Sequence, residues 1–340
     1  MAGAFAETII AWQRQHGRHD LPWQTKLNQA PNPYAIWVSE IMLQQTQVTA
    51  VIGYYAKFMQ RFPTIAVLAN ATQEEVLQYW SGLGYYSRAR NLHAAAQKIV
   101  DDFGGEFPTQ FDDILSLSGI GRSTAAAIST FALNAPQPIL DGNVKRVFAR
   151  HFNISGWPST PKIEQAMWQI AVRENPTENA VAYTQGLMDL GATLCTRTKP
   201  YCAACPVNTS CEAFANNLVS LLPTPKPRKV IPEKSTTMLV FMHGDEVMLE
   251  KRPPMGIWGG LWSFPEVDDV VKHSPLSKLT HTFTHFKLHI TPQLVCMHKT
   301  IPQVNEAGKI WLPIDDAIGA AIPTPIRKIL LQLKALKNQN

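Results

Sequence analysis

The sequence lacks several features that would place it outside the soluble globular proteins. Within its 340 residues no apolar run approaches the roughly 18 residues needed to span a bilayer. The N-terminal stretch has no basic leader, and Glu7 falls where a signal peptide should be apolar. Charged residues make up 17% and hydrophobic residues 45%, which argues against disorder over most of the length. These absences predict a globular, cytoplasmic protein with room for two domains.

Charge of one sign is not strongly in excess either. The sequence holds 31 Lys and Arg residues against 26 Asp and Glu residues, a formal net charge of +5 at pH 7. A mild basic excess permits a polyanionic partner such as DNA but does not demonstrate one. Composition therefore leaves the function open, and only local motifs can narrow it.

Cysteine is scarce and unevenly placed. Of five cysteines, Cys296 stands alone and is expected in a core, while the others crowd into one loop: Cys195, Cys202, Cys205 and Cys211. In a reducing compartment such crowding indicates a metal site rather than disulfides. Zinc sites usually combine two separated pairs of cysteines, whereas this single loop favours a [4Fe-4S] cluster with four thiolate ligands. Zinc and free buried cysteines are the alternatives.

The spacing of apolar residues divides the chain. Residues 1–222 show helical periodicity and no strand-like alternation. After a proline-rich, basic linker at 223–234, the segments TTMLVFM, EVMLEKR and THTFTHFKLHI predict strands. The expected fold is multidomain, with an all-α domain followed by a smaller α+β module at 235–340. Helices are expected over residues 34–60, 73–80, 88–101, 111–117, 122–132, 143–151, 161–174, 178–190 and 324–337.

Two glycines around one apolar residue indicate a tight turn at 117–121, between two helical patterns. The next helix begins near Arg122, so the free N–H groups of its first turn can bind a phosphate. A Gly119-x-Gly121 turn alone is weak evidence, because most such turns are only turns. Followed by the four-cysteine loop at 195–211, it resembles the helix-hairpin-helix arrangement of the endonuclease III superfamily.

Asp141 occupies, in PILDGNVKR, the position of that superfamily's catalytic aspartate. As the residue before a predicted helix it has an alternative role as an ordinary N-cap, and the two roles are compatible. Near a helix N-terminus and close in sequence to Lys145 and Arg146, its carboxylate is expected to stay ionised. A persistent anion is what an oxocarbenium-like sugar cation requires.

Glu40 lies in IWVSEIML, where Trp37, Ile41 and Leu43 surround it with apolar side chains on a helix. A carboxyl group in such surroundings should have a raised pKa and hold a proton near neutrality. The alternative is an exposed glutamate on the polar face of the helix. Two carboxyl groups in opposed environments suggest one acid and one anion, which the expulsion of a base requires.

Five segments make the resemblance more specific: WVSEIMLQQTQV, SGLGYYSRARNL, PILDGNVKRV, LMDLGATLCTRTKPYCAACP and GIWGGLWSFPE. They resemble the MutY-type adenine DNA glycosylases over almost the whole chain. The resemblance implies a monomer that excises adenine opposite 8-oxoguanine or guanine in double-stranded DNA. It further implies that Glu40 protonates adenine at N7 and that Asp141 stabilises the sugar cation, with Asn143 beside it.

Ser123 distinguishes two classes of enzyme within this resemblance. Bifunctional relatives such as endonuclease III have a lysine there, which forms a Schiff base and cuts the strand by β-elimination. Serine cannot form an imine, so a monofunctional glycosylase is expected, with Lys145 as a phosphate contact. The alternatives are a bifunctional pyrimidine-specific glycosylase/lyase, which needs an amine at 123, and a non-enzymatic DNA sensor, which would need neither Glu40 nor Asp141.

Extrusion of adenine from the stack requires groups that fill the gap and hold the base. The resemblance assigns the gap and the opposite base to Gln45, Thr46, Leu83 and Tyr85, although Leu83 and Tyr85 have core packing as an alternative. It assigns the adenine pocket to Leu21, Trp23, Met188 and the nearby Gln185. Phosphate contacts are expected from Gly119, Gly121, Arg122 and Lys145.

The second module resembles a Nudix fold but has no Arg-Glu-x-x-Glu-Glu run, so nucleotide hydrolysis is not expected. The resemblance instead assigns the recognition of 8-oxoguanine to the loop Phe283-Thr284-His285. A weaker alternative is zinc bound by His281, His285 and His289 along one strand edge.

Three positions depart from the family pattern. Ser118 stands where proline is more common in the hairpin, and Thr284 stands where serine is usual in the lesion loop. His19 precedes DLPW in place of a fixed cation, so its charge can depend on pH.

Overall fold

The computed structural model describes residues 3–26, 28–227, 230–267, 274–297 and 308–337. Contacts group the chain into Met1–Ala66 with Ala94–Arg228, called unit 1 here, and Val67–His93 with Lys229–Asn340, called unit 2. The sequence predicts a division after residue 222, whereas the helical segment 67–93 groups with the C-terminal part. No helix among the described residues is long and apolar enough to cross a membrane.

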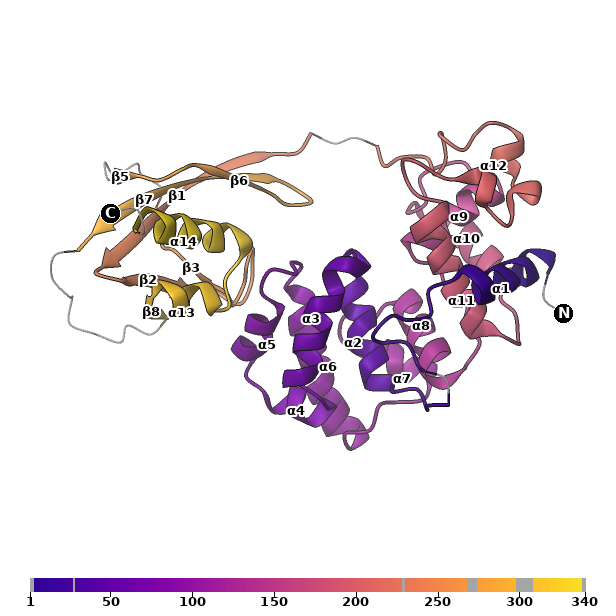
Figure 1. Cartoon of the computed structure of the whole chain (residues 1–340), viewed down its shortest axis with the longest axis horizontal. Coiled ribbons are helices and arrows are strands. Elements are labelled where there is room, and N and C mark those ends of the chain that lie inside the picture. Colours follow the sequence, from indigo (N-terminus) through magenta and orange to yellow (C-terminus); the bar gives the residue numbers. More distant parts are fainter. Residues whose placement is uncertain (1–2, 27, 228–229, 268–273, 298–307, 338–340) are drawn as a thin grey trace. The chain divides into compact units, whose positions relative to one another are not determined.

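Helices make up unit 1 (Figure 1). Several expected helices have almost the predicted bounds, and the helix expected over 161–174 spans those residues. The helices that lie wholly in unit 1 are α1 (Ala4–His16), α2 (Pro33–Leu43), α3 (Val48–Arg61), α7 (Phe111–Leu115), α8 (Arg122–Leu133), α9 (Gly142–His151), α10 (Pro161–Glu174), α11 (Ala180–Asp189) and α12 (Glu212–Ala215). Short helical turns follow α11, at Leu190–Leu194, Cys202–Ala204 and Asn208–Ser210. Helices α4 (Ile65–Asn70) and α6 (Ser87–Phe103) run from one unit into the other, and α5 (Gln73–Trp80) belongs to unit 2.

The single helix expected over 34–60 is wrong, because α2 and α3 are separate. Gln45 has a φ of 58°, in the left-handed region, which ends α2 before α3 begins at Val48. The N-terminus of α2 is capped by the Asn32 side chain, which accepts the N–H of Ala35. Apolar residues continue at helical spacing across the break, so periodicity alone does not reveal it.

One hydrophobic core joins α1, α9 and α11 in unit 1. Phe148 of α9 is fully buried, and its ring centroid lies 6.1 Å from that of Phe5 and 5.6 Å from that of Phe152. Gly186 allows α11 to approach α1 closely, since a Cβ there would lie 2.7 Å from the Ile9 side chain. This core holds the N-terminus of α9, and with it Asp141, in place.

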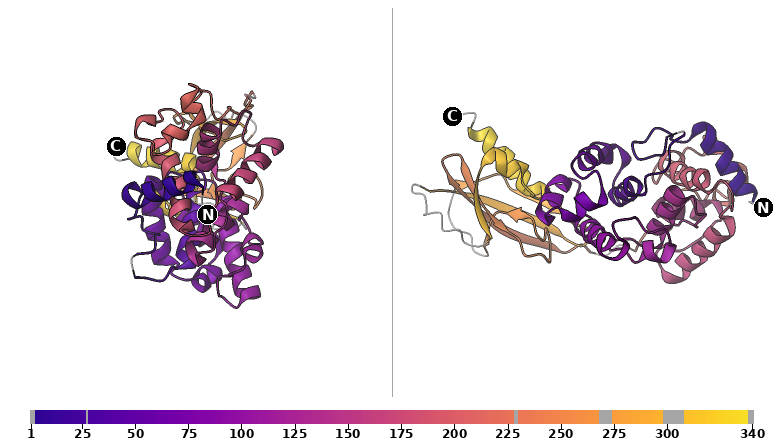
Figure 2. Two further views of the ribbon diagram at one scale, coloured as in Figure 1. Left: turned by 90° about the vertical axis from the view of Figure 1, so that its right-hand side faces the viewer. Right: turned by 90° about the horizontal axis from the view of Figure 1, so that it is seen from below.

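A mixed eight-stranded sheet forms the centre of unit 2, and helices α13 and α14 lie along it (Figures 1 and 2). The strand order is β3-β2-β1-β7-β5, with β4 on β1, β6 on β7 and β8 on β2. Strands β1 and β7 pair in parallel, and the other pairs are antiparallel. The elements are β1 (Glu233–His243), β2 (Glu246–Lys251), β3 (Trp262–Ser263), β4 (Glu266–Val267), β5 (Ser274–Pro275), β6 (Leu279–Thr282), β7 (Lys287–Cys296), β8 (Lys309–Pro313), α13 (Ile314–Gly319) and α14 (Thr324–Lys337).

The alternating segment 280–290 is two strands rather than one. Strands β6 and β7 are joined by a tight turn in which the N–H of Phe283 donates to the carbonyl of Phe286 over 2.8 Å. Alternation persists on both sides of the turn, so the sequence pattern hides it. Cys296 ends β7 and is exposed, which overturns the expectation of a core cysteine.

Within unit 2 the segment 67–93 is tied to the sheet and its loops by polar contacts. Glu74 of α5 accepts from the indole N–H of Trp262 and pairs with Lys251. Arg90 donates to the carbonyl of Gly259 over 2.9 Å, and the Ser81 hydroxyl donates to the carbonyl of Ile322 over 2.8 Å. These bonds explain why a helical segment groups with a distant part of the sequence.

The aromatic core of unit 1 predicts a large cost for one substitution. Phe148→Ala removes a fully buried ring, so we expect the free energy of unfolding to fall by about 3–5 kcal/mol. Urea denaturation measures the change, with Val172→Ala as the control, because the Val172 side chain is 56% exposed and should lose less than about 0.5 kcal/mol. Equal losses in the two variants would contradict the placement of this core.

Candidate functional site

A cavity of about 460 Å³ opens in unit 1 between several helices and the loop after α1. Its wall is mixed in character and contains one carboxyl group, Glu40. Concave sites of this size with a few convergent polar groups are typical of small-molecule or base binding. The residues that line it are Gln13, His19, Trp23, Gln24, Thr25, Ile36, Ser39, Glu40, Phe131, Asn134, Asn179, Val181, Ala182 and Gln185.

Glu40 reaches this cavity from α2, whose other side is packed into the core. Burial, together with the nearby charge of Asp141, raises the pKa of its carboxyl group from 4.5 to about 8. Near neutrality the group therefore holds its proton. The expectation of a raised Glu40 pKa is confirmed, and apolar helix neighbours such as Trp37 and Ile41 are buried as expected.

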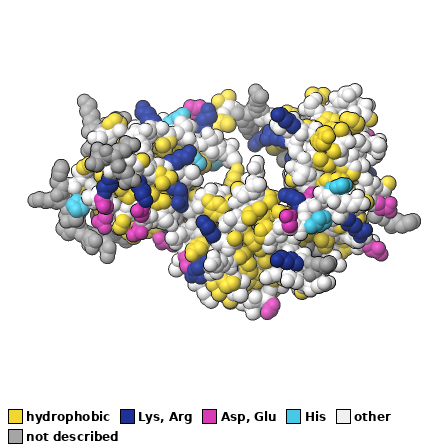
Figure 3. All heavy atoms as spheres, viewed as in Figure 1, with side chains coloured by type: hydrophobic (Ala, Val, Ile, Leu, Met, Phe, Trp, Pro, Cys, Tyr) yellow, Lys and Arg dark blue, Asp and Glu magenta, His cyan; other side chains and the backbone are white. Residues whose placement is uncertain are grey.

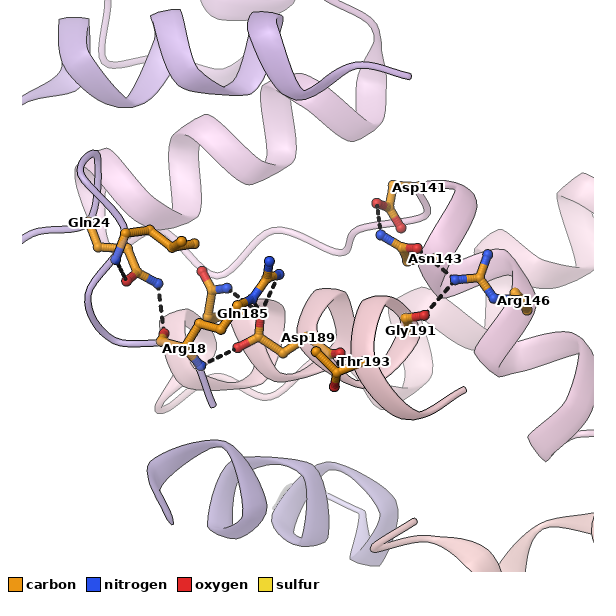
Figure 4. Close-up of polar contacts among 10 residues, drawn as sticks. Arg18, Gln24, Asp141, Asn143, Arg146, Gln185, Asp189, Gly191 and Thr193 are labelled. Atoms are coloured by element: carbon orange, nitrogen blue, oxygen red, sulfur yellow. Dashed lines mark hydrogen bonds and ion pairs between the residues drawn. The ribbon is translucent and has the colours of Figure 1, made fainter. Parts of the chain in front are cut away.

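Asp141 is the N-cap of α9. Its Oδ1 accepts the N–H of Val144 over 2.7 Å, and its Oδ2 lies 3.5 Å from the amide nitrogen of Asn143 (Figure 4). Burial nevertheless raises the Asp141 pKa above its usual value, and these bonds together with the charge of Arg146 oppose the shift. The sequence predicts that this carboxylate stays ionised because of the helix N-terminus and the nearby cations, and this prediction leaves out the desolvation that raises the pKa.

The hairpin between α7 and α8 leads into Ser123, which contacts the backbone just before Asp141. Gly119 has a φ of 81°, which a glycine adopts without strain, and Gly121 is the N-cap of α8. The N–H of Leu140, the residue before Asp141, donates to the Ser123 hydroxyl over 3.2 Å. Ser123 is therefore hydrogen-bonded to the residue that precedes Asp141.

The expected adenine pocket is only partly matched. Trp23 and Gln185 line the cavity, but its described lining includes neither Leu21 nor Met188, and Met188 packs instead against the core of unit 1. Sequence reasoning missed several polar residues of the wall, among them Gln13 and Gln24. No spacing in the sequence signals them, because the wall forms only when the loop after α1 folds back onto α11.

Arg18 and Asp189 form a second feature that the sequence analysis missed. Asp189 of α11 is buried, and its carboxylate accepts from the Arg18 guanidinium, the Arg18 N–H and the Gln185 amide (Figure 4). A signal was present, since Gln185 and Asp189 are four residues apart and therefore neighbours on one face of a helix.

The four clustered cysteines line one small cavity around the buried side chain of Arg150. Arg150 donates to Cys195 Sγ over 3.3 Å and to the carbonyls of Thr196 and Leu222, each over 2.8 Å. Burial raises the pKa of the Cys205 thiol to about 11. The sequence analysis missed Arg150, although it lies one helical turn beyond Arg146, which donates to the carbonyl of Cys195.

All four clustered cysteines line one common cavity. Within the described residues no group of three or more His, Cys, Asp or Glu side chains is placed to hold one metal ion. Four thiols that line one cavity are the ligand set that a cofactor bound by four thiolates requires.

Residues expected to contact DNA are placed as follows. Gln45 and Tyr85 have left-handed backbones, with φ of 58° and 50°, and Tyr85 is 46% exposed. Leu83 is buried, in agreement with its packing alternative, and Thr46 is half-buried in the turn after α2. Non-glycine residues with positive φ are strained, and strain of this kind clusters at functional sites.

Of the expected phosphate contacts, two cations already have partners. Lys145 forms an ion pair with Glu164 over 2.7 Å, and the Arg122 guanidinium lies 3.9 Å from the ring centroid of Trp168. On the face drawn in Figure 3, Lys and Arg side chains are scattered among acidic ones in both units. Charge on this face therefore does not single out a DNA-binding surface.

In unit 2 the segment Phe283-Thr284-His285 forms the turn between β6 and β7. Phe283 stacks on Phe286 at 4.5 Å and lies 5.5 Å from the ring centroid of Trp258, while Thr284 and His285 are exposed. The zinc alternative fails in its geometry, because the three histidines do not share one strand. His281 is on β6, His285 is in the turn, and His289 is on β7 with its Nε2 2.8 Å from Glu233.

Comparison with known proteins agrees with this architecture. The sequence profile of the HhH-GPD superfamily base excision DNA repair protein matches residues 38–172, and that of the NUDIX domain matches residues 236–332. The adenine DNA glycosylase of Buchnera aphidicola subsp. Baizongia pistaciae is 36% identical over 345 residues and covers 97% of each chain. The chain belongs to the adenine DNA glycosylase family.

Other members of this family extend the match. The adenine DNA glycosylase of Homo sapiens is 32% identical and covers 96% of this chain and 73% of its own. Among solved structures, a thermostable thymine-DNA glycosylase is 27% identical with a TM-score of 0.56, and it covers 62% of this chain and 95% of its own. An endonuclease III–DNA complex, 20% identical with a TM-score of 0.53, shares the helical fold over 63% of this chain and 95% of its own. As an adenine DNA glycosylase family member, the chain is a DNA repair enzyme with a helical HhH-GPD domain and a Nudix-like domain.

The raised pKa of Glu40 predicts a pH-dependent stability. Between about pH 4.5 and 8 the unfolded chain releases this proton while the folded chain keeps it, so the free energy of unfolding falls as pH rises. Above about pH 8 Glu40 is ionised in both states, and the free energy of unfolding falls no further on its account. Glu40→Gln is neutral throughout, so from pH 5 to pH 9 it should gain on the order of 4 kcal/mol relative to the wild type.

Urea denaturation at both pH values measures this difference. Asp102→Asn is the matched control, because it changes a carboxylate that is 51% exposed and paired with Lys98, and its difference from the wild type should not grow with pH. Parallel pH profiles for Glu40→Gln and the wild type would show that Glu40 is ionised at neutral pH.

Proposed function

We propose that the enzyme removes adenine paired with 8-oxoguanine or guanine and leaves the DNA strand uncut. The observation that carries this proposal is the carboxyl group of Glu40, which lines the cavity with its pKa raised to about 8. A general acid with a pKa near the working pH is effective in protonating a leaving group. Family membership, through the adenine DNA glycosylases that match nearly the full chain, supports adenine as the base.

In this proposal the two carboxyl groups take different roles, Glu40 as the acid and Asp141 as the anion. The charge of Asp141 raises the Glu40 pKa, whereas Asp141 accepts the N–H of Val144 and lies near Arg146, which favour its anion. The proton of the pair therefore resides on Glu40 near neutrality. This arrangement gives one acid and one anion, as sequence reasoning expected, although burial rather than the helix terminus dominates the pKa of both groups.

In the proposed reaction Glu40 donates its proton to N7 of adenine while the bond between N9 and C1′ breaks. The bonding electron pair leaves with the base, and positive charge develops on the sugar. The Asp141 anion stabilises that charge, with Asn143 orienting its carboxylate. Water then adds to C1′ and returns a proton to the Glu40 carboxylate, which completes the cycle.

Ser123 supports the absence of strand cleavage. A lyase needs an amine that attacks C1′ and forms an imine, and a hydroxyl cannot do so. The Ser123 hydroxyl instead accepts the N–H of Leu140, which supports the backbone just before Asp141. Lys145, which follows Asp141 in the next helix, has an amine, but its ammonium is paired with Glu164.

The four-cysteine loop is proposed to hold a [4Fe-4S] cluster through Cys195, Cys202, Cys205 and Cys211. Two observations support this assignment: the four thiols line a common cavity, and the buried guanidinium of Arg150 lies beside them. A cation there would balance the negative charge of four thiolate ligands. Bound there, the cluster would tie the loop together at four points. Arg146 and Arg150 already join that loop to α9, the helix that begins after Asp141.

The turn Phe283-Thr284-His285 is proposed to recognise 8-oxoguanine. Thr284 and His285 expose their polar groups in this turn, and the neighbouring rings of Phe283 and Phe286 stack on each other. Such a turn can offer a planar contact for a base and hydrogen bonds to its edge. A monomer is proposed as the active form.

A single-turnover assay tests the proposed reaction. Duplexes should carry adenine opposite 8-oxoguanine, adenine opposite guanine, or thymine glycol opposite adenine, and products should be resolved with and without alkali. We expect breaks only after alkali, fastest for adenine opposite 8-oxoguanine, and a loss of at least about 100-fold in Glu40→Gln. Asp102→Asn serves as the control with unchanged activity, since its carboxylate lies on the exposed face of α6.

Two results of this assay would overturn the proposal. Strand breaks without alkali would move the enzyme to the bifunctional class and would show that an amine other than residue 123 forms an imine. Full activity of Glu40→Gln would remove the role of the acid.

The cluster proposal predicts a difference between two cysteine variants. Cys202→Ser replaces one of the four proposed ligands and should lower the iron content and the visible absorption of the purified protein. Cys296→Ser replaces an exposed cysteine at the end of β7 and should leave both unchanged. Zinc in place of iron, or iron that persists in full in Cys202→Ser, would contradict the assignment.

A further inference from the structure

The side chain of Asp189 is buried but bonded on all sides. Its Oδ2 accepts the backbone N–H of Arg18 over 2.8 Å, and its Oδ1 accepts from the Arg18 guanidinium over 2.7 Å and from Nε2 of Gln185 over 2.8 Å. The Gln24 amide closes the group, because it donates to the carbonyl of Arg18 over 2.8 Å. Gln24 and Gln185 both line the cavity that contains Glu40. Asp189 is therefore connected to two residues of the cavity wall without lining the cavity itself.

The carboxylate determines which end of the Gln185 amide faces it. An ionised carboxylate only accepts hydrogen bonds, so it can be met only by the amide nitrogen. The Arg18 guanidinium and the Arg18 N–H donate to the same carboxylate, so both Asp189 oxygens act as acceptors. Figure 4 shows the result, with the Gln185 nitrogen toward Asp189 and the carbonyl oxygen directed away from it. The group that Gln185 has left for a ligand in the cavity is thus an acceptor.

An acceptor in this position distinguishes bases by their exocyclic groups. Adenine presents an amino group, a donor, where guanine presents a carbonyl oxygen, an acceptor. The Gln185 carbonyl oxygen can accept a hydrogen bond from the adenine amine, whereas the carbonyl oxygen of guanine would repel it. A site built to bond a polar group of its substrate discriminates strongly against analogues that lack the group, because its own buried polar atom is then left without a partner.

We infer that Asp189 is a positioning residue for substrate choice: by fixing the polarity of the Gln185 amide, it makes the cavity select a base with an exocyclic amine. The inference rests on the proposed function, since it concerns the base that Glu40 protonates. Arg18 acts one step further out. Its guanidinium and its backbone N–H both donate to Asp189, which ties the loop after α1 to α11.

Asp189→Asn tests this inference, because asparagine keeps the shape but can donate as well as accept, so the Gln185 amide is free to turn over. Single-turnover release should be measured for adenine and for purine, its analogue without the amino group, both opposite 8-oxoguanine. We expect the adenine-to-purine rate ratio to fall by about tenfold in Asp189→Asn. Asp102→Asn is the matched control and should leave the ratio unchanged.

A double-mutant cycle separates this role from general loosening of the fold. In a Gln185→Leu background the ratio should already be low, and adding Asp189→Asn should not lower it further. Loss of rate for both substrates with an unchanged ratio would overturn the inference and leave Asp189 a purely structural residue. Absence of adenine release by the wild type would instead overturn the proposed function, so the two failures are distinguishable.

A measurement on the wild-type chain covers the case in which Asp189→Asn does not fold. The Gln185 side-chain NH₂ signal in ¹⁵N-labelled protein can be assigned from its absence in Gln185→Leu. We expect one slowly exchanging, downfield-shifted amide proton, as for a donor bonded to a carboxylate. Exchange as fast as that of an exposed glutamine would show that Asp189 does not hold the amide, and the inference would fail.

Discussion

Helix α9 is held at both ends by charged side chains, and the rest of the candidate site depends on it. At its start the Asp141 carboxylate accepts the N–H of Val144, and near its end the buried Arg150 guanidinium donates to backbone carbonyls of the cysteine loop. Arg146 lies between them and donates to the carbonyls of Cys195 and Gly191 (Figure 4). One rigid element thereby links the proposed reacting carboxylate to the proposed cofactor loop.

Desolvation is the largest cause of the pKa shifts of the candidate catalytic carboxyl groups. Burial raises the pKa of both Glu40 and Asp141, and the charge of Asp141 contributes to the shift at Glu40. At Asp141 hydrogen bonds from Val144 and Asn143 oppose the shift. At Asp189 a buried carboxylate accepts from the Arg18 guanidinium and from the amide nitrogen of Gln185, and these bonds fix the orientation of that amide.

Much of the fold could be predicted from the sequence because its signals are local. The helix at 161–174, the terminal helix at 324–337 and the change from helices to strands all follow from residue spacing, and the structure confirms them. Breaks were harder, since apolar spacing continues across the turn at Gln45 and across the turn at 283–286. Cys296 was misplaced for a related reason, because a strand end looks like a strand interior in a short pattern.

The sequence by itself determined the chemistry that is available: four thiols in one loop, a carboxyl group among apolar neighbours, a carboxylate before a helix, and serine at position 123 in place of an amine. Motifs that are contiguous in the chain carry such information whatever the surrounding fold. Only the tertiary structure decided how those groups behave. It showed that burial raises the pKa of Asp141, that Lys145 is paired, and that Arg18, Arg150 and Asp189 support the site from outside it. Desolvation and long-range hydrogen bonds depend on which residues meet after folding, and the spacing of residues along the chain does not contain that information.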